Sequence, residues 1–410
     1  MRATSLKHFH PVNFQSLSNF IKTSKELTDL DLHRMIPYGR QSINAADIKA
    51  VTAVLTSDFL TQGPQVEAFE QALAKECGAT YALVFSSGTA ALHAAYFSAG
   101  LTAKDEFITS PLTFAATANA GLYLGAKPVF ADVDEHGNLD PAEVTKKLTP
   151  QTKAIVVVDY AGFPAKLKEL RAIANKAGIV LIEDACHALG ATYHGKPIGT
   201  HSDLTVFSFH PVKSITTGEG GAVLTDNKIF YEKMKLFRVH GITKDTKRFT
   251  HNADGDWYSE MHTLGFNYRL TDMQASLGRS QLKRLHTFME KRREKALQYD
   301  TAFAPHVSKF ILPVWKDGSS VSALHLYPIR LREGTLARKK MFVALRDAGI
   351  GAQVHYLPVY LHPYYEKLGY PKGLCPRAEA FYESVISLPL FPDLSRHDQK
   401  HVIQTVIENL

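Results

Sequence analysis

The chain has 410 residues, of which 45% are hydrophobic and 21% charged. These values are close to globular averages and exclude a disordered, collagen-like or low-complexity protein, while the length suggests two or three domains. The formal net charge of +7 is a mild surplus for this length. It permits a small anionic ligand, but without a clustered basic stripe we expect no nucleic-acid partner.

The cysteines predict a reducing compartment. There are three, Cys77, Cys186 and Cys375, and their spacing matches neither a disulfide framework nor a zinc site. No apolar run approaches the roughly 18 residues of a membrane helix, and the first residues lack the apolar core of a secretory signal. We therefore expect a cytoplasmic protein with no membrane span and no metal site.

The hydrophobic pattern predicts an α/β fold. After a polar stretch over 1–35, apolar residues recur at helical spacing at Ile48, Val51 and Leu55. Short apolar runs follow and are separated in several places by helical patterns, as at 89–99, 114–124 and 165–177, which indicates a mostly parallel sheet covered by helices. The apolar runs are 81–85, 107–112, 128–133, 154–160, 180–184, 204–209 and 221–225.

The last of these runs, 221–225, follows its predecessor too closely for a parallel crossover, so it is expected to be antiparallel to that strand. Beyond residue 270 a helical pattern runs to about 303, and a smaller unit follows. It contains a strand at 323–330, a helix at 335–348 and a Pro/Tyr-rich stretch at 354–371. We expect an N-terminal extension over 1–35, a large domain over 36–285 and a small C-terminal domain over 286–410.

Three segments at predicted strand ends carry chemistry, because parallel sheets gather ligands at the carboxyl ends of their strands. The first, 86–92 (Ser-Ser-Gly-Thr-Ala-Ala-Leu), joins a strand to a helix. Gly88 allows close backbone approach, Thr89 adds a hydroxyl, and the helix N-terminus offers free N–H groups to a phosphate. The same segment also fits a plain helix cap.

The second segment, 180–187, ends an apolar strand in Glu-Asp-Ala-Cys-His. A buried acid needs a partner, so Asp184 could hold a cationic ring nitrogen, or it could cap a helix. His187 could face the same ligand or simply pack. The third segment, 207–221, places Lys213 in a loop after a buried strand, among small hydroxyls and glycines. There a lysine can lose its proton and attack carbonyls, although most lysines lie on the surface.

Together the three segments suit pyridoxal phosphate. This cofactor needs a lysine that forms a Schiff base, an acid on its pyridine nitrogen and an anchored phosphate. The acid keeps the ring nitrogen protonated, so that the ring can accept the electrons released when the substrate loses its α-proton. Lys213 is then the natural proton shuttle.

At these residues the chain resembles the DegT/DnrJ/EryC1/StrS family of sugar aminotransferases, over about residues 35–405. The resemblance implies a fold-type I, pyridoxal-phosphate-dependent transferase, with a mixed, mostly parallel seven-stranded sheet in the large domain and a smaller α+β C-terminal domain. The matching motifs are Ser87-Gly88-Thr89-Ala90-Ala91-Leu92, Glu183-Asp184-Ala185-Cys186-His187-Ala188, Phe207-Ser208-Phe209-His210-Pro211-Val212-Lys213, Gly218-Glu219-Gly220-Gly221 and Gly265-Phe266-Asn267-Tyr268-Arg269-Leu270.

The resemblance also implies roles for individual residues. Lys213 is the Schiff-base lysine, Asp184 pairs with the pyridine nitrogen, and His187 lies near the cofactor ring. Phe114 takes the place of the aromatic that stacks on that ring. Gly88, Thr89 and Ser208 fall at phosphate-anchoring positions. Asn267 matches a residue that reaches the phosphate from a partner subunit, which implies a homodimer with shared active sites.

A further set of segments resembles one branch of this family. Members of that branch transfer the amino group of L-glutamate to C4 of a UDP-linked 4-keto-6-deoxy-N-acetyl hexose and release 2-oxoglutarate. The segments are 36–41, 59–64, 158–162, 213–217, 325–328 and 353–356. Candidate contacts to the sugar or to carboxylates, each of which could equally be structural, are Tyr38, Gln62, Tyr160, Arg269, His325 and His355.

Three alternatives stand beside this reading. An aminotransferase for another UDP- or dTDP-linked 3- or 4-keto sugar would look much the same, because loops shape the sugar site. A C3 dehydratase of the same family would carry His in place of Lys213. A non-catalytic regulatory protein would be expected to have lost Lys213, Asp184 or the phosphate seat, and all three are present.

Overall fold

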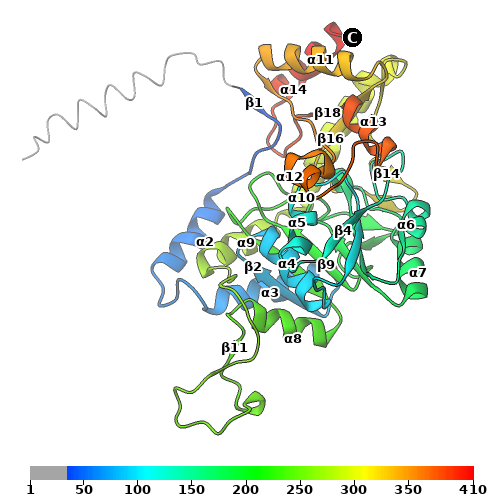
Figure 1. Ribbon diagram of the computed structural model, residues 1–410. Helices are drawn as coiled ribbons and strands as arrows, with labels where there is room; N and C mark the ends of the chain where they lie inside the picture. The colour runs from blue at the N-terminus through cyan, green and yellow to red at the C-terminus, as the bar shows by residue number, and fades with distance from the viewer. Residues whose placement is uncertain (1–34) are drawn as a thin grey trace, which may run out of the picture.

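A computed structural model describes residues 35–410, so the extension predicted over 1–35 lies outside the described residues apart from Met35. Its centre is a seven-stranded sheet with helices on both faces (Figure 1). In spatial order the strands are β2 (Tyr81–Phe85), β10 (Gly221–Thr225), β9 (Leu204–Ser208), β6 (Val180–Asp184), β5 (Thr152–Val158), β3 (Glu106–Thr109) and β4 (Lys127–Phe130).

Only β10 runs against its neighbours. It pairs antiparallel with β9 and β2, and the pairs among β4, β3, β5, β6 and β9 are parallel. This confirms the predicted α/β class and the predicted direction of 221–225. The strands β3, β4 and β5 end earlier than their apolar runs, because the last residues of those runs already turn into the loops at the carboxyl edge.

Alternate strand residues face two helical layers, as the period of a strand requires. On β5, Ile155 and Val157 join one core, whereas Ala154 and Val156 join the other. The first core is covered mainly by α3, α6, α7 and α9, and the second by α4, α5 and α8. These helices are α3 (Pro64–Cys77), α4 (Gly88–Ser98), α5 (Ala116–Leu122), α6 (Pro141–Lys147), α7 (Leu167–Ala177), α8 (Lys228–Phe237) and α9 (Asp272–Leu282).

The prediction of a single long helix from 270 to 303 is wrong in one respect, because this stretch forms two helices, α9 and α10 (Leu285–Phe303). At the break Arg284 leaves the helical backbone region, with φ −107° and ψ 4°. Its guanidinium forms an ion pair with the buried carboxylate of Asp47 and reaches the Ser42 carbonyl at 3.1 Å. These contacts tie α2 (Ala45–Leu55) to the α9–α10 junction.

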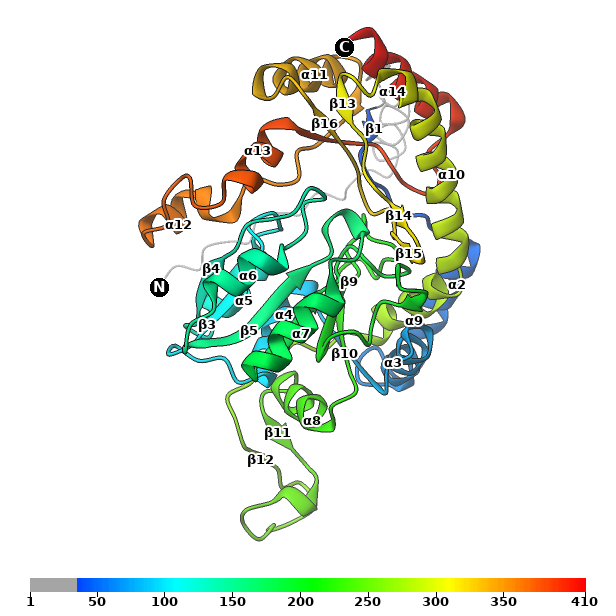
Figure 2. The ribbon, with the colours of Figure 1, turned by 90° about the vertical axis from the view of Figure 1, so that its right-hand side faces the viewer.

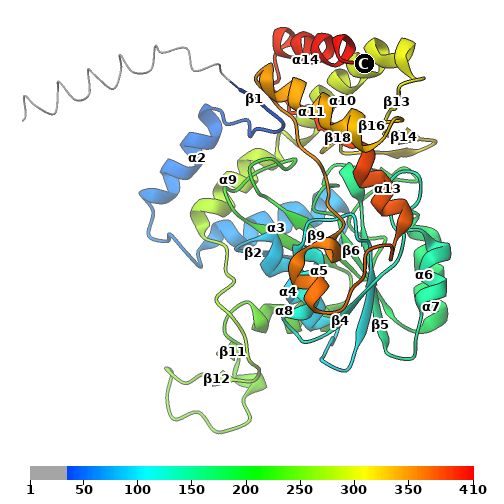
Figure 3. The same ribbon diagram turned by 45° about the horizontal axis from the view of Figure 1, so that its top comes forward.

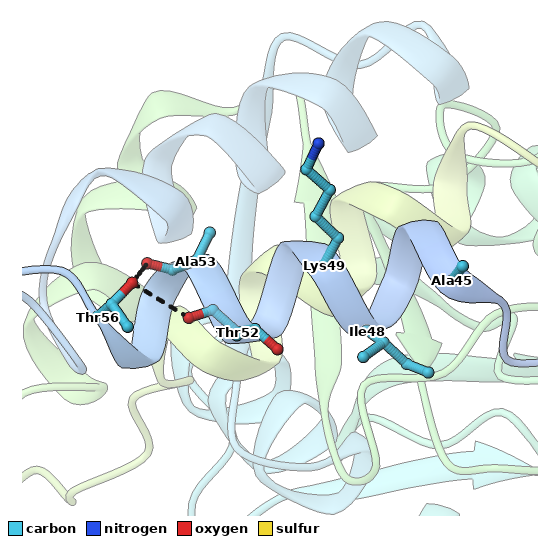
Figure 4. A pocket seen from close by; sticks show the side chains of 6 residues that line it. All are labelled: Ala45, Ile48, Lys49, Thr52, Ala53 and Thr56. Carbon is cyan, nitrogen blue, oxygen red and sulfur yellow. Dashed lines mark hydrogen bonds between the residues drawn. The ribbon is translucent and has the colours of Figure 1, made fainter.

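The α2 helix itself is present, but the predicted apolar face does not point to the core. Asp47 and Val54 are its buried residues, whereas Ile48 and Leu55 are 62% and 56% exposed. Figure 4 shows the open side of the helix, where Ala45, Ile48, Lys49, Thr52, Ala53 and Thr56 line a shallow hollow. Among residues 35–410, no apolar side chain buries this face of α2.

A second, smaller core lies at the carboxyl edge of the main sheet, around a three-stranded sheet in the order β13-β16-β18 (Figure 2). Its strand β1 pairs with β17, so residues 36–37 pack with the C-terminal part of the chain. The limits predicted for the two domains stay a prediction. The elements are β1 (Ile36–Pro37), β13 (Phe310–Ile311), β16 (Tyr327–Leu331), α11 (Thr335–Asp347), β17 (Ile350–Gly351), α12 (Pro363–Lys367), α13 (Pro376–Ser384), β18 (Val385–Leu388) and α14 (Arg396–Glu408).

The strand predicted at 323–330 begins only at Tyr327. The residues before it hydrogen-bond to the turn at 160–162 of the main unit instead, through Ala323 N to Gly162 O at 3.0 Å and His325 N to Ala161 O at 3.1 Å. The Pro/Tyr-rich stretch contains a short 3₁₀ turn over Val359–Leu361 and the helix α12. Residues 323–326 therefore form a strap across the carboxyl edge of the large sheet.

An arm projects from the opposite end of the molecule, between α8 and α9 (Figures 1 and 3). Its base is the two-stranded ladder of β11 (Ile242–Thr243) and β12 (Glu260–Met261).

A separate four-stranded sheet is built from β7 (Thr192–Tyr193), β8 (Lys196–Pro197), β14 (Lys316–Asp317) and β15 (Ser320–Val321). Within residues 35–410, no helix combines the length and the apolar character that crossing a membrane requires.

Candidate active site

A cavity of about 470 Å³ opens at the carboxyl edge of the main sheet, beneath the strap. The loops after β2, β3, β6 and β9 form its floor and walls, and residues from both ends of the chain close it. Most of the residues singled out from the sequence meet here. They are Tyr38, Gly88, Thr89, Phe114, Asp184, His187, Ser208, Lys213, His325 and His355.

The N-terminus of α4 faces the cavity as both a helix cap and an anion seat. Ser87 is the N-cap, and its Oγ accepts a hydrogen bond from Ala90 N at 3.1 Å. The first N–H groups of a helix have no partner inside it, and here they open onto the cavity. A Cβ on Gly88 would lie 3.0 Å from Ser208 Cβ, and one on Gly221 would lie 2.6 Å from Ser87 O. Both glycines are therefore required by close packing.

Asp184, the last residue of β6, is buried and held by two donors. Thr117 Oγ1 donates to its Oδ2 at 2.6 Å, and Cys186 N donates to its Oδ1 at 3.2 Å. Thr113 Oγ1 lies 2.7 Å from Thr117 Oγ1. Because the Thr117 proton points at the carboxylate, Thr113 must donate to Thr117. The chain of hydroxyls fixes the carboxylate while it still faces the cavity.

Lys213 lies in the turn after β9, where its backbone N–H donates to His210 O at 2.9 Å. Burial of the amine lowers its pKa, and the nearby Cys186 and Asp184 partly oppose that shift. The charged form is disfavoured by desolvation and favoured by the carboxylate. The amine is therefore easier to deprotonate than an exposed lysine, as a nucleophile or proton carrier needs to be.

Three histidines, His187, His325 and His355, line the same cavity. The rings of His187 and His325 lie 4.2 Å apart between centroids, and Tyr356 Oη is 3.1 Å from His187 Nε2. His355 Nδ1 is 2.9 Å from Ser387 Oγ. Burial holds the pKa of His187 and of His325 well below the usual range and that of His355 at about 4. All three rings are neutral at neutral pH.

Pyridoxal phosphate fits these residues. Phe114 is a large apolar side chain that is 64% exposed on the cavity wall, which leaves one ring face open to a flat ligand. The α4 terminus, with the close approach of Gly88 to Ser208, provides a cradle for a phosphate. Asp184 and Lys213 supply the acid and the amine that this cofactor requires.

Four of the residues predicted from the sequence do not line this cavity. Gln62 and Arg269 border a separate pocket of about 370 Å³ together with Lys235 and Arg238. Tyr160 is buried, and its hydroxyl donates to His355 O at 2.6 Å. Its role in this chain is therefore to hold the cavity wall.

Asn267, the fourth, lies near the base of the arm, where it forms a β-bridge with Val239. In a single chain Asn267, Gln62 and Arg269 are thus all outside the cavity of Lys213.

Among the cavity residues that sequence reasoning did not single out are Thr117 and Tyr356. Both stand in segments that had been singled out for a neighbour, Phe114 in one case and His355 in the other. The signal for Thr117 was its spacing from Thr113, since residues four apart face each other on a helical turn. No local pattern marks Tyr356, because its partner His187 is distant in the sequence.

Comparisons with known proteins agree with this geometry. The family model for the DegT/DnrJ/EryC1/StrS aminotransferase family matches residues 41–407. The UDP-4-amino-4,6-dideoxy-N-acetyl-beta-L-altrosamine transaminase of Campylobacter jejuni, serotype O:23/36, is 42% identical over 380 residues, which cover 92% of this chain and 98% of that protein.

Two solved structures extend the comparison. Helicobacter pylori PseC, described as an aminotransferase of pseudoaminic acid biosynthesis, superposes with a TM-score of 0.85 at 37% identity and covers 92% of this chain and 99% of its own. The putative sugar aminotransferase Spr1654 of Streptococcus pneumoniae, in its PLP form, gives 0.85 at 29% identity and covers 92% and 100%. The chain belongs to the DegT/DnrJ/EryC1/StrS aminotransferase family. It is a sugar aminotransferase that depends on pyridoxal phosphate.

The buried neutral histidines predict a loss of stability in acid. Between pH 6.5 and about 4 the unfolded chain binds a proton at residue 355 that the folded chain refuses, so stability falls as the pH falls. His355 alone accounts for up to about 3 kcal/mol. Urea unfolding of His355→Asn, whose amide can still bond to Ser387, should show a shallower decline than the wild type over this range.

The exposed His397 gives a matched control. His397→Asn should leave the pH dependence of the unfolding free energy unchanged. An equal decline in wild type and His355→Asn would contradict the assignment of a buried neutral ring at this position.

Proposed function

We propose that the enzyme transfers the amino group of L-glutamate to C4 of UDP-2-acetamido-2,6-dideoxy-β-L-arabino-hex-4-ulose. The products are UDP-4-amino-4,6-dideoxy-N-acetyl-β-L-altrosamine and 2-oxoglutarate, in pseudaminic acid biosynthesis. The observation that carries this proposal is the 42% identity, over nearly the full length of both chains, to a transaminase named for that amino sugar. The same reaction class is supported by the candidate cofactor residues, which all share one cavity except Asn267.

Separate groups of residues would hold the phosphate, the ring face and the ring nitrogen of the cofactor. The α4 terminus with Gly88 and Thr89, together with Ser208, would bind the phosphate, and Phe114 would stack on the ring. Asp184, oriented by Thr117, would keep the ring nitrogen protonated. When bound, the cofactor supplies an aldehyde that takes up the amino group and a ring that accepts electrons.

Lys213 would anchor the cofactor and then serve as the proton carrier. Its lowered pKa would let the amine, once the substrate has displaced it, take the α-proton of glutamate. It would then pass this proton to the bound cofactor. In the second half-reaction the same amine would deliver a proton to C4 of the keto sugar. His187, neutral and hydrogen-bonded to Tyr356, would orient the ring without adding charge.

Substrate contacts are proposed for the residues that close the cavity from above. Tyr38, His325 and His355 line it and come from the N-terminal segment and the small unit. Neutral histidines and a tyrosine can donate and accept hydrogen bonds to sugar hydroxyls and to an N-acetyl group. They form a wall suited to an uncharged sugar ring.

An alternative is amination of another UDP- or dTDP-linked 3- or 4-keto sugar. The cofactor residues would be the same, because the difference lies in the side chains around the sugar. This alternative and the main proposal differ only in which ketone reaches Lys213 in a productive orientation.

A substrate panel separates the two. Purified enzyme with L-glutamate is offered UDP- and dTDP-linked 4-keto and 3-keto sugars, and product NMR gives the position and stereochemistry of the new amine. We expect turnover with the L-arabino 4-keto sugar, and a C4 amine with the configuration of the altrosamine product. Turnover only with a competing sugar would overturn the named substrate, and Lys213→Ala should abolish turnover in either case.

We further propose that the enzyme is a homodimer with shared sites. Apolar side chains stay uncovered on α2 and on the arm, where Ile48, Trp257 and Leu264 are 62%, 74% and 75% exposed. Exposed apolar surface of this kind marks contact surfaces between proteins. A second copy would cover it and would bring Asn267 to the phosphate site of its partner.

Hybrid dimers test the sharing of sites. Lys213→Ala and Asn267→Ala chains are each expected to lose most activity. In a hybrid, the site that uses Lys213 of one chain and Asn267 of the other is intact, so random mixing should restore about a quarter of the wild-type activity. If Asn267 acted within its own chain, co-expression of the two variants would restore none.

We place the enzyme in a reducing compartment, the cytoplasm. Its three cysteines are free thiols, and Cys77 and Cys375 are buried in separate cores. Burial raises the pKa of both thiols. Buried thiols of this kind are inert structural residues and do not form bridges.

A further inference from the structure

Beneath the cofactor cavity, on the other face of the sheet, lies a nest of buried polar groups that the mechanism does not use. Asp159 follows β5 and Glu183 is the penultimate residue of β6, and both are completely buried. Val157 pairs with Glu183 in the ladder, so residues 157, 159 and 183 share one face while Asp184 points to the other.

The two carboxyl groups lie close together, and Glu183 raises the pKa of Asp159. Asp159 Oδ1 accepts from Ala165 N at 2.9 Å, and Glu183 Oε2 accepts from Thr205 Oγ1 at 3.0 Å. The remaining oxygens, Asp159 Oδ2 and Glu183 Oε1, are buried and have no hydrogen-bond partner among the described residues. Two ionised carboxylates cannot bond to each other, whereas one shared proton would give both oxygens a partner.

Electrostatics favours the proton on Asp159. Burial and the neighbouring Glu183 raise the pKa of Asp159 well above its usual range. Burial also raises the pKa of Glu183, but the hydrogen bond that Thr205 donates favours its charged form. The other titratable groups that interact with the pair are His201, from the loop before β9, Asp184 on the other face of the sheet, Cys77 and Tyr193. A pair that shares one proton carries one negative charge.

Asp159 also begins the turn Tyr160–Gly162, which supports the roof of the active site. Its backbone N–H donates to Asp184 O at 3.3 Å, and its carbonyl accepts from Gly162 N at 3.1 Å. From that turn Ala161 O accepts His325 N, Gly162 O accepts Ala323 N, and Tyr160 Oη bonds to His355 O. A Cβ on Gly162 would lie 2.6 Å from His187 O, so the turn packs directly against the cofactor loop.

We propose that Asp159 and Glu183 share one buried proton and act as positioning residues, locking the turn Tyr160–Gly162 that holds the strap with His325 and the segment with His355 over the cofactor cavity. The proton-sharing bond joins the ends of β5 and β6 at the point where Asp184 leaves the sheet. This inference rests on the proposed function only in taking the cavity as the active site.

Infrared spectroscopy detects the proton directly, without substrate. At neutral pH the wild-type protein should show the carbonyl stretch of one protonated carboxyl that is missing from both Asp159→Asn and Glu183→Gln. Either amide can donate to the remaining carboxylate, so the bond persists while the proton is gone. The surface variant Glu290→Gln should match the wild type. Absence of the band in the wild type, or its presence in both variants, would overturn the proposal.

The positioning role is read from the half-reaction with L-glutamate, followed by the absorbance of the cofactor. Asp159→Asn and Glu183→Gln should lose less than about threefold in rate, because the bond is kept. Glu183→Leu should lose at least about tenfold at unchanged cofactor content. The rate of Thr205→Val, which removes only the donor to Glu183, should lie between those of the amide variants and the leucine variant. Thr205→Val replaces Glu183→Leu in the comparison if the leucine variant does not fold.

Equal rates in Glu183→Leu, Thr205→Val and the wild type would overturn the positioning role. Equal damage in the amide and leucine variants would do so as well, since a retained bond would then bring no benefit. A wild-type enzyme that does not react with glutamate would count against the proposed amino donor. The infrared measurement would still show whether Asp159 and Glu183 share a proton.

Discussion

The structure depends on holding an amine and a carboxylate close together in the cavity at the carboxyl edge of the main sheet. Burial lowers the pKa of Lys213, and the nearby Cys186 and Asp184 partly offset that shift. Neither group could serve the chemistry alone, because an exposed lysine would stay protonated and an unpartnered buried acid would take up a proton. The balance between the two sets the working range of the amine.

The parallel sheet makes this arrangement possible. The loops after β2, β3, β6 and β9 all open at one edge, so Gly88, Phe114, Asp184 and Lys213 meet although they span more than a hundred residues. The antiparallel strand β10 brings Gly221 against Ser87 and closes the phosphate cradle from behind. Each helix or turn that follows a strand then orients one group, as α5 does when Thr117 bonds to Asp184.

Much of this was predictable from the sequence, and the failures have physical causes. Apolar runs and their spacing identified the strands and the antiparallel β10, because period and loop length are local properties. The motifs located residues that line the cavity, since these stand at strand ends. The break at Arg284 was missed because its cause is a buried aspartate on a distant helix. The exposure of Ile48 was missed because helical spacing marks an apolar face without showing whether residues 35–410 pack against it.

The roof of the site was the least predictable part. Tyr356 meets His187, and the strap meets the turn at 160–162, through contacts between segments far apart in the sequence. The central claim, that Lys213 carries the cofactor opposite Asp184, is tested most directly by reducing the purified holoenzyme with borohydride and mapping the modified peptide. The account predicts a single pyridoxyl adduct, on Lys213. An adduct on another lysine, or none, would contradict it.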